Sequence, residues 1–369
     1  MTGEPDDTAD HAAGRPAVDV ERTDSVADVA DVAAPGLTVR VGGDPFCAYL
    51  FGEDVPVLTK PVVYPLVAPG GRPVTRGYPL DPRPNERVDH PHHVGSWLAY
   101  GNVDGLDFWN NSPEVPDDRA DEYGTIRHRD VERTASGRGT GQFTVTADWV
   151  TADGERRLAE ESTFVVRAWS GDSGDGDGGG AGDTRPASSG ARRVIDRRTT
   201  LTATDGAVAL PDDKEGFLGL RVARELEHPT DEPVTLTDRH GETVEVDAGD
   251  DDVATGEYHS SEGVRGTDVW GTRARWVTLH GERDGPVSVT IMDHPDNVGY
   301  PTYWHARGYG LFAANPLGAS VFTDGEERRD ARLADGESLT VRYRIAVDAG
   351  RPTAEALDVR HESFVDAWD

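Results

Sequence analysis

The chain is poor in cysteine and lysine. Its 369 residues contain one cysteine, Cys47, so an internal disulfide is excluded, and nothing beside Cys47 suggests a catalytic thiol. Of the 37 basic residues, only Lys60 and Lys214 are lysines and the rest are arginines. A lysine kept where arginine has replaced almost all others can mark a position that needs a compact ammonium group. We expect Lys60, before Pro61 at a strand start, to be structural; Lys214 is a candidate site residue or else an ordinary surface lysine.

Long apolar runs are also missing. No run approaches the roughly 18 residues that a transmembrane helix needs. The N-terminal segment is acidic and has neither the basic nor the apolar region of a secretory signal. We therefore expect a soluble, cytoplasmic protein.

Positive charge is scarce, because 68 acidic residues oppose 37 basic ones and give a net charge of −31. Such a field repels phosphate backbones and anionic lipids, so we expect no nucleic-acid and no membrane partner. Residues 1–35 carry nine of the acids and two arginines, so most of the excess is spread through the rest of the chain. Because salt screens the repulsion within so acidic a surface, this composition predicts a halophilic protein.

Two segments have the composition of unfolded chain. Residues 1–35 lack aromatic and long apolar side chains, and we expect a disordered acidic tail. Residues 170–191 are rich in glycine, aspartate and serine and predict a flexible loop between strands. No other block differs in composition, so residues 36–369 are predicted to form a single domain.

Period-two alternation of apolar and polar residues dominates that domain. It is clear in residues 37–41, 143–147, 287–291 and 339–345, and Asp-Gly or His-Gly turns separate many such segments. Only the residues after Pro352 have the pattern of a helix. The sequence therefore predicts an all-β fold, an antiparallel sandwich or barrel, with few short helices; we favour a large antiparallel β-sandwich.

Three of the twelve histidines, His90, His92 and His93, fall within four residues. Pro91 disfavours helical backbone at His90, so His90 is expected to be extended; if the strand continues, His92 shares its face and His93 points away. A hairpin around residues 102–105 would then bring His, Trp, Asn and Asp side chains together. Two such histidines plus another ligand could also hold Zn²⁺ or Fe²⁺, although the spacing matches no specific zinc motif.

A second segment repeats the pattern. The triplet Asp-His-Pro recurs at residues 293–295, close to Asn297 and to the residues 303–307, which contain tryptophan, histidine and arginine. Aromatic faces stack on sugar rings, and Asn, Asp, His and Arg bind hydroxyl groups. The alternative is structural, because histidines bonded to backbone carbonyls and tryptophans in a core give a similar sequence.

These motifs resemble, in order, the family usually labelled PmoA, a domain of unknown function. The resemblance spans about residues 37–347, and the acid-rich chain is similar to a family member of haloarchaeal type. The motifs that carry the resemblance are Pro65-Leu66, residues 71–76, residues 89–93, residues 105–109, Lys214-Glu215-Gly216, residues 270–276, Asp293-His294-Pro295 and residues 303–316. One departure is Asn102-Val103-Asp104-Gly105, where the family commonly has Asp-Val-Asn-Gly. The chain lacks the apolar helices of the methane monooxygenase subunit of that name. The resemblance implies a fold distantly related to the galactose-mutarotase supersandwich, whose members mostly handle carbohydrates.

The favoured function is a carbohydrate-active enzyme, an epimerase, lyase or hydrolase acting on a sugar or an oxidised sugar. A histidine would supply the acid, Glu215 or Asp107 the base, and Lys214 and Arg307 would stabilise negative charge. The alternatives are a non-catalytic carbohydrate-binding protein and a metal-dependent enzyme that uses the histidines. No cofactor is predicted. The predicted catalytic residues are His92, His93, Lys214, Glu215, His294 and His305, and the predicted substrate-binding residues are Arg76, His90, Trp97, Asp107, Trp109, Asn297, Trp304, Arg307, Tyr309 and Asn315.

Overall fold

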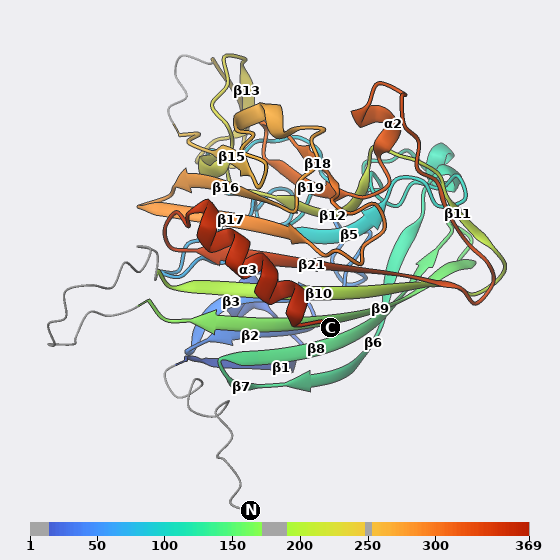
Figure 1. The fold of residues 1–369 in the computed structure, drawn as a ribbon, viewed down its shortest axis with the longest axis horizontal. Coiled ribbons are helices and arrows are strands. Elements are labelled where there is room, and N and C mark those ends of the chain that lie inside the picture. Colours follow the sequence, from blue (N-terminus) through green and yellow to red (C-terminus); the bar gives the residue numbers. More distant parts are fainter. Residues whose placement is uncertain (1–14, 172–189, 248–252, 369) are drawn as a thin grey trace, which may run out of the picture.

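A computed structural model describes residues 15–171, 190–247 and 253–368. Two large sheets pack against each other, and all ladders between their named strands in these residues are antiparallel (Figure 1). The prediction of an all-β antiparallel sandwich is confirmed. The alternation noted in the sequence is the cause, because each strand buries one face between the sheets.

The first sheet has nine strands in the order β18-β19-β12-β5-β4-β3-β2-β1-β7. Their bounds are β1 Ala17–Thr23, β2 Gly36–Val41, β3 Asp44–Leu50, β4 Val62–Val63, β5 Ser96–Tyr100, β7 Gly137–Arg138, β12 Gly216–Arg221, β18 Tyr303–Ala306 and β19 Leu311–Asn315.

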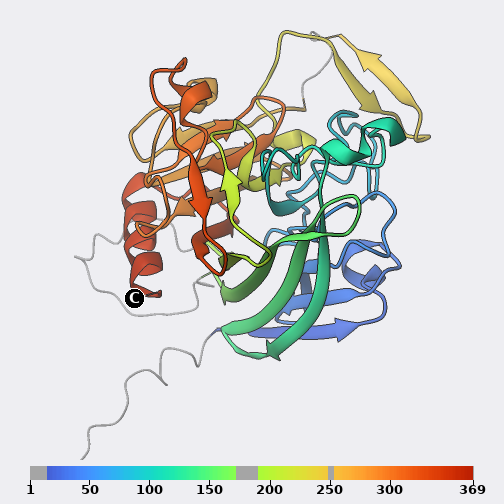
Figure 2. The ribbon, with the colours of Figure 1, turned by 90° about the vertical axis from the view of Figure 1, so that its right-hand side faces the viewer.

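The second sheet has eight strands in the order β15-β16-β17-β21-β10-β9-β8-β6. Their bounds are β6 Thr125–Ala135, β8 Thr140–Val150, β9 Arg156–Trp169, β10 Arg192–Ala203, β15 Glu257–Ser260, β16 Trp276–Glu282, β17 Pro286–Asp293 and β21 Ser338–Asp348. Two small sheets pair β11 (Val208–Leu210) with β20 (Ala331–Leu333) and β13 (Val234–Thr237) with β14 (Thr243–Val246). The β13–β14 hairpin projects from the body of the molecule (Figure 2).

One apolar core joins the two large sheets. Tyr49 of the first sheet contacts the rings of Phe143 and Phe164 of the second, with ring centroids 5.8 and 5.6 Å apart. Burial of such large rings supplies most of the free energy that holds the sheets together.

The helices are few, as predicted. The α-helices are α1 (Ala27–Ala30), α2 (Ala319–Phe322) and α3 (Ala354–Asp366), and short 3₁₀ turns span Asp117–Glu122, Arg224–Leu226 and Gly266–Val269. Helix α3, expected from the residues after Pro352, lies on the outer face of the second sheet, where Leu357 and Phe364 pack on Trp276 and Met292 (Figure 1). No helix in the described residues is long and apolar enough to cross a membrane.

The predicted tail needs correction. Residues 1–14 lie outside the described residues, but Ala17–Thr23 form β1, which pairs with β2 along its whole length. Val18 and Val20 alternate with acidic residues and enter the core, so a strand forms without any aromatic residue. Most of the predicted loop 170–191 also lies outside the described residues, and the single-domain organisation stays a prediction.

The outward face of the first sheet positions the candidate site. In register across β5, β12, β19 and β18, a row of residues runs from Trp97 through Gly219 and Ala313 to His305. The rows on either side, one with Trp304 and the other with Phe312, turn to the other side of the sheet, where Phe312 meets Tyr258 of the second sheet. The small residue Gly219 in this row leaves room for the rings of Trp97 and Trp109 over the sheet.

Candidate active site

The three clustered histidines lie in a turn and not in a strand. The amide of His93 donates to the carbonyl of His90 over 3.0 Å, and His90 has a φ of 42°. The expectation of an extended His90 with His93 pointing away is therefore wrong. The turn gathers the three rings, with centroids of His90 and His93 4.9 Å apart and of His92 and His93 4.2 Å apart. A left-handed residue reverses the chain where the rule for residues before proline favours extension.

Arg76 holds this turn in place through hydrogen bonds to its backbone. Its fully buried guanidinium donates to the carbonyls of Arg87, Asp89, His90 and His93 and to the carboxylate of Asp89. All of these acceptors belong to the turn and its approach. Arg76, predicted to bind substrate, is instead a positioning residue.

Arg221 is a second buried arginine that the sequence reasoning missed. Its guanidinium lies 3.3 Å from Nδ1 of His93, donates to Asp89 over 2.7 Å, and stacks on Tyr309 at 4.9 Å. The buried carboxylate of Glu227 pairs with Arg87 at 3.0 Å and with Arg224 at 2.6 Å. The odd arginine in the apolar strand residues 217–222 was the available signal, since a buried arginine needs such partners.

Glu215 and His305 are the pair of side chains best placed for acid–base chemistry. Oε2 of Glu215 lies 3.6 Å from Nδ1 of His305, and Oε1 lies 2.9 Å from Nζ of Lys214. Burial raises the pKa of Glu215, against the lowering effect of Lys214. Burial, with the charges of Arg307 and Lys214, lowers the pKa of His305 to about 3, so the imidazole is neutral at neutral pH.

His92 and His93 are neutral for the same reason. Burial is the main cause that lowers the pKa of His92, with a contribution from Lys60, and it also lowers the pKa of His93. A neutral imidazole can accept a proton but has none to spare as a general acid. His90 is the exposed member of the three, with 41% of its side chain accessible.

Two polar residues that the sequence predicts to bind substrate or to act as a base form hydrogen bonds with backbone groups. Asn315 donates to the carbonyls of Asp213 and Lys214 over 2.9 and 2.6 Å, which fixes the segment that carries Lys214 and Glu215. Asp107 accepts from the amides of Trp109 and Asn110. Both side chains position their neighbours.

The tryptophans of the site are buried. Trp97 stacks on His93 at 5.1 Å and meets Trp109 edge-on at 5.0 Å. A Cβ added at Gly219 would come within 2.5 Å of Trp97 and 2.8 Å of Trp109, so glycine is what allows both rings to lie on the sheet. Both rings are fully covered, so they support the histidine turn and offer no exposed stacking face.

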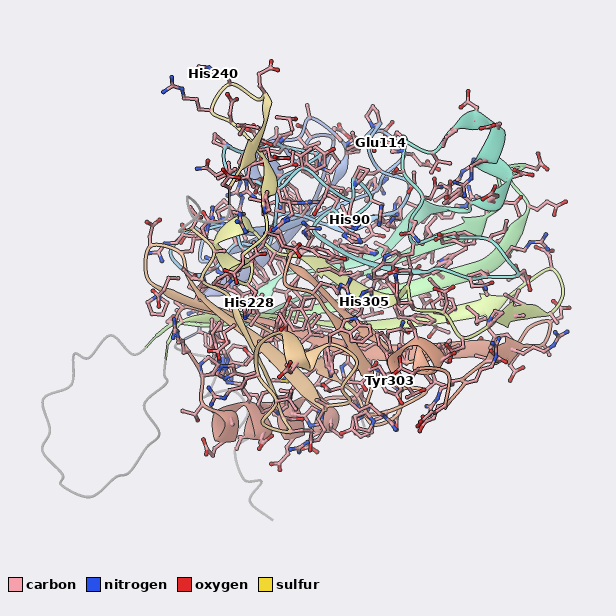
Figure 3. All side chains as sticks on the ribbon, turned by 90° about the horizontal axis from the view of Figure 1, so that it is seen from above. His90, Glu114, His228, His240, Tyr303 and His305 are labelled. Carbon is pink, nitrogen blue, oxygen red and sulfur yellow. The ribbon has the colours of Figure 1, made fainter. Side chains whose placement is uncertain are left out.

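An open cavity of about 520 Å³ borders the cluster. Tyr309 stacks on His90 at 4.9 Å and also lines the cavity, together with Arg307, Trp270, Arg87 and residues of the segment 228–232. Arg307 lies over the rings of both Trp270 and Tyr309 at 5.8 Å. Figure 3 shows His90, His305 and His228 on the same face of the molecule. Trp270 and His228 are further residues that the site prediction missed; Trp270 opened one of the motifs listed from the sequence.

Three predicted residues have other surroundings. Trp304 is buried on the face toward the second sheet, where its Nε1 donates to the carbonyl of Ala274. His294 packs edge-on against Phe364 of α3 at 5.3 Å. Asn297 bonds Asp293 and the backbone of Arg342. The structure therefore does not bring these three to the histidine turn, and the two Asp-His-Pro triplets do not form one site.

The described residues contain no group of three or more His, Cys, Asp and Glu side chains arranged to hold a metal ion. The rings of His90, His92 and His93 are close, but His90 and His93 stack on each other and on Tyr309 and Trp97, and His92 meets both of them edge-on. Stacked rings do not aim their nitrogen lone pairs at one point. The metal-dependent alternative thus lacks a ligand set in this part of the chain.

Comparison with protein families identifies the chain. Residues 36–362 match the family model described as "Family of unknown function (DUF6807)". The chain belongs to this family. Among solved structures, the chain is similar to one titled "Crystal Structure Analysis of HI1317", with 6% identity and a TM-score of 0.26 over 89% of this chain and 100% of that chain. No curated protein sequence matches the DUF6807 chain.

Proposed function

We propose that this DUF6807 protein is a carbohydrate-active enzyme that moves a proton on an acidic sugar. The observation that carries the proposal is the Glu215–His305 pair with Lys214 beside it. The aromatic and arginine-lined cavity has in its wall Ala306, the residue that follows His305. The charge of Glu215 contributes to the pKa of Tyr309, so the pair and the cavity wall lie within electrostatic reach of each other.

Burial decides which of the two groups holds a proton more tightly. It raises the pKa of Glu215 and lowers the pKa of His305 to about 3, so Glu215 is the stronger base of the pair. In the proposal Glu215 therefore exchanges the proton with the substrate and neutral His305 orients the carboxyl group of Glu215, in place of the histidine acid expected from the sequence. The ammonium of Lys214 stabilises negative charge that develops on the substrate.

The cavity favours an oxidised sugar over a neutral one. Trp270 and Tyr309 are partly exposed rings that can stack on a sugar face. The exposed guanidinium of Arg307 sits between them and can bind a carboxylate in two-point geometry. A volume of about 520 Å³ is in the range that holds one or two sugar rings.

The same cavity would serve a non-catalytic sugar-binding protein, which remains the second candidate. The enzyme and the binding protein differ in their dependence on Glu215, because sugar binding tolerates a glutamine at this position and proton transfer does not. The resemblance to PmoA-labelled and galactose-mutarotase-like proteins supports a carbohydrate ligand at the level of the fold only. We also propose a cytoplasmic, halophilic setting, on the acidic composition alone.

The test is a comparison of binding with turnover. Wild type, Glu215→Gln, His305→Gln and the exposed control Glu155→Gln are titrated calorimetrically with uronic and aldonic acids, and product formation is followed by NMR. We expect binding within about threefold of wild type in both site variants, and turnover reduced by about 10²–10⁴-fold. Binding without any turnover in wild type would favour the second candidate. Wild type that neither binds nor converts any of these sugars would refute the proposal.

A further inference from the structure

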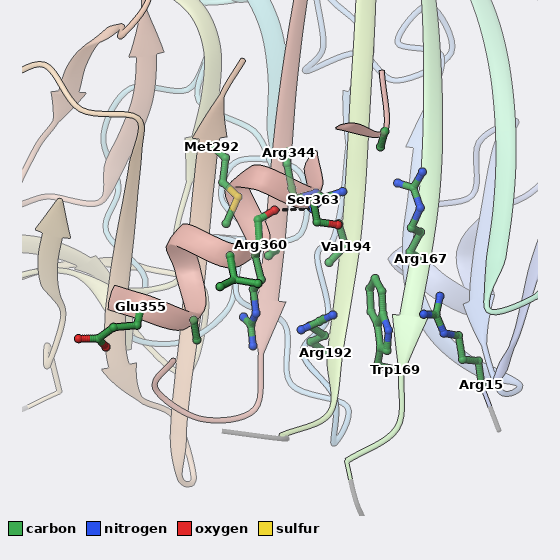
Figure 4. A pocket seen from close by; sticks show the side chains of 14 residues that line it. Arg15, Arg167, Trp169, Arg192, Val194, Met292, Arg344, Glu355, Arg360 and Ser363 are labelled. Atoms are coloured by element: carbon green, nitrogen blue, oxygen red, sulfur yellow. Dashed lines mark hydrogen bonds between the residues drawn. The ribbon is translucent and has the colours of Figure 1, made fainter. Parts of the chain in front are cut away.

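A second cavity lies on the opposite sheet, under α3. It has a volume of about 620 Å³, and its walls come from β9, β10, β17 and β21 on one side and α3 on the other (Figure 4). Its apolar surface includes Val194, Met292, Ala346 and Val359. None of the residues of the candidate active site lines it.

Five arginines line this cavity, in a chain whose net charge is −31. They are Arg15, Arg167, Arg192, Arg344 and Arg360. The acidic residue of the lining is Glu355, at the exposed start of α3, and Figure 4 shows its carboxylate directed away from the guanidiniums. Positive charge is thus concentrated where the rest of the surface is acidic.

Buried carboxylates balance only part of this charge. Asp196 pairs with Arg167 and with Arg344, and Asp348 pairs with Arg360 at 2.9 Å. Arg192 and Arg15 stack on Trp169, with guanidinium-to-ring distances of 3.9 and 4.8 Å. Within the described part of the chain, neither of these two guanidiniums has a carboxylate within 4.0 Å.

The crowding of these cations is unfavourable in itself. Burial, followed by repulsion from Arg360, lowers the pKa of Arg192 to about 10, with further repulsion from Arg344 and Arg15, while the charge of Asp348 acts in the opposite direction. Arg167 is lowered to the same pKa of about 10 by burial, Arg344 and Arg15. A bound anion would remove this repulsion, and guanidinium forks suit carboxylate and phosphate oxygens.

We propose that the arginine cavity binds a small organic anion that carries at least two negative charges, on carboxylate or phosphate groups. Arg192 and Arg15, which stack on Trp169, present donors that no carboxylate of the described residues occupies. The apolar wall around Met292 and Val194 contacts the body of the ligand. The proposal does not depend on the function of the Glu215 site.

Calorimetric titration of the full chain with two probes tests this proposal, one probe for each chemistry: inorganic pyrophosphate and citrate. All titrations are run at one fixed ionic strength set with KCl, because screening alone would otherwise mimic a difference. The variants are Arg192→Gln and Arg15→Gln, and Arg119→Gln on the exposed 3₁₀ turn is the matched control.

We expect saturable binding of at least one probe in wild type, weakened at least tenfold in both cavity variants and unchanged in Arg119→Gln. Preference for pyrophosphate assigns the site to phosphorylated ligands, and preference for citrate assigns it to polycarboxylates. Circular dichroism verifies that each variant is folded. If Arg192→Gln does not fold, Arg15→Gln tests the cavity by itself. The proposal is overturned if neither pyrophosphate nor citrate binds in the KCl buffer, or if both cavity variants bind the probes as tightly as wild type.

Discussion

Lys60 shows how one side chain can be chosen by its surroundings. It is buried, and its ammonium donates to the carbonyl of Trp109 over 2.9 Å. Burial lowers its pKa to about 7, although the charge of Asp107 acts in the opposite direction. The carbonyl of Trp109 is a single acceptor that suits a compact ammonium, whereas a guanidinium would bring five donors into the same apolar space.

Lys60→Met is expected to change the pH dependence of stability. In the unfolded chain the lysine pKa is near 10.5, and in the folded chain it is about 7. Between these values the unfolded chain binds more protons, so the free energy of unfolding of wild type rises with pH and the cost of the buried ammonium is largest below pH 7. Urea titrations should show that the free energy of unfolding of wild type is higher at pH 9.5 than at pH 7 by on the order of 2 kcal/mol. The Lys60→Met variant should not show this increase.

The control for this prediction is Lys214→Met, because the Lys214 side chain is 46% exposed. Its pH dependence should follow that of wild type. A Lys60→Met variant with the wild-type slope would show that the ammonium of Lys60 is not desolvated in solution.

At the scale of elements, the turn of residues 90–93 depends on contacts from distant parts of the chain. Arg76 supplies donors to four carbonyls of this region, and Arg221 of β12 fixes Asp89 and His93. The two buried guanidiniums hold the turn through their terminal NH groups, and among the described residues the Nε of each has no hydrogen-bond partner. Removal of one partner leaves buried polar groups unpaired.

Arg76→Lys is expected to destabilise the protein by about 3 kcal/mol, since one ammonium cannot reach the acceptors that the guanidinium fork serves. The unfolding midpoint should fall, and ligand binding at the Tyr309 cavity should weaken because His90 loses its fixed position against Tyr309. Denaturant unfolding and calorimetry measure the two effects. Arg133→Lys, on the exposed part of β6, is the control and should change neither. A variant as stable as wild type would contradict the positioning role.

At the scale of the whole molecule, charge and shape are separate matters. The sheets bury a continuous core whose packing does not depend on ionic strength, while the net charge of −31 resides mostly on the surface. Like charges on a folded surface repel one another and destabilise the compact state. Some of the arginines are buried, among them Arg76 and Arg221 at the histidine turn and Arg344 at the cavity under α3.

Raising KCl from 0.1 to 2 M is therefore expected to raise the melting temperature by at least several degrees. The Debye length falls from about 10 Å at 0.1 M to about 3 Å at 1 M, which screens the surface repulsion. Differential scanning calorimetry measures the effect, with an uncharged osmolyte at equal osmolality as the control for solvent exclusion. A melting temperature that is high at low salt and insensitive to KCl would refute the halophilic prediction.

The sequence by itself determined the all-β class, the helix after Pro352 and the strands at residues 37–41, 143–147, 287–291 and 339–345, because alternation at period two directly reports which face of a strand is buried. It also pointed to His90 and Tyr309, whose rings stack, and to Glu215 and His305, whose side chains lie 3.6 Å apart. Only the tertiary structure decided the rest. Strand register put Trp97, Gly219, Ala313 and His305 in one row and turned Trp304 away. Long-range burial lowered the pKa of His92, His93 and His305, and packing of α3 on the second sheet created the arginine cavity. These effects depend on residues far apart in the chain, and no local pattern encodes them.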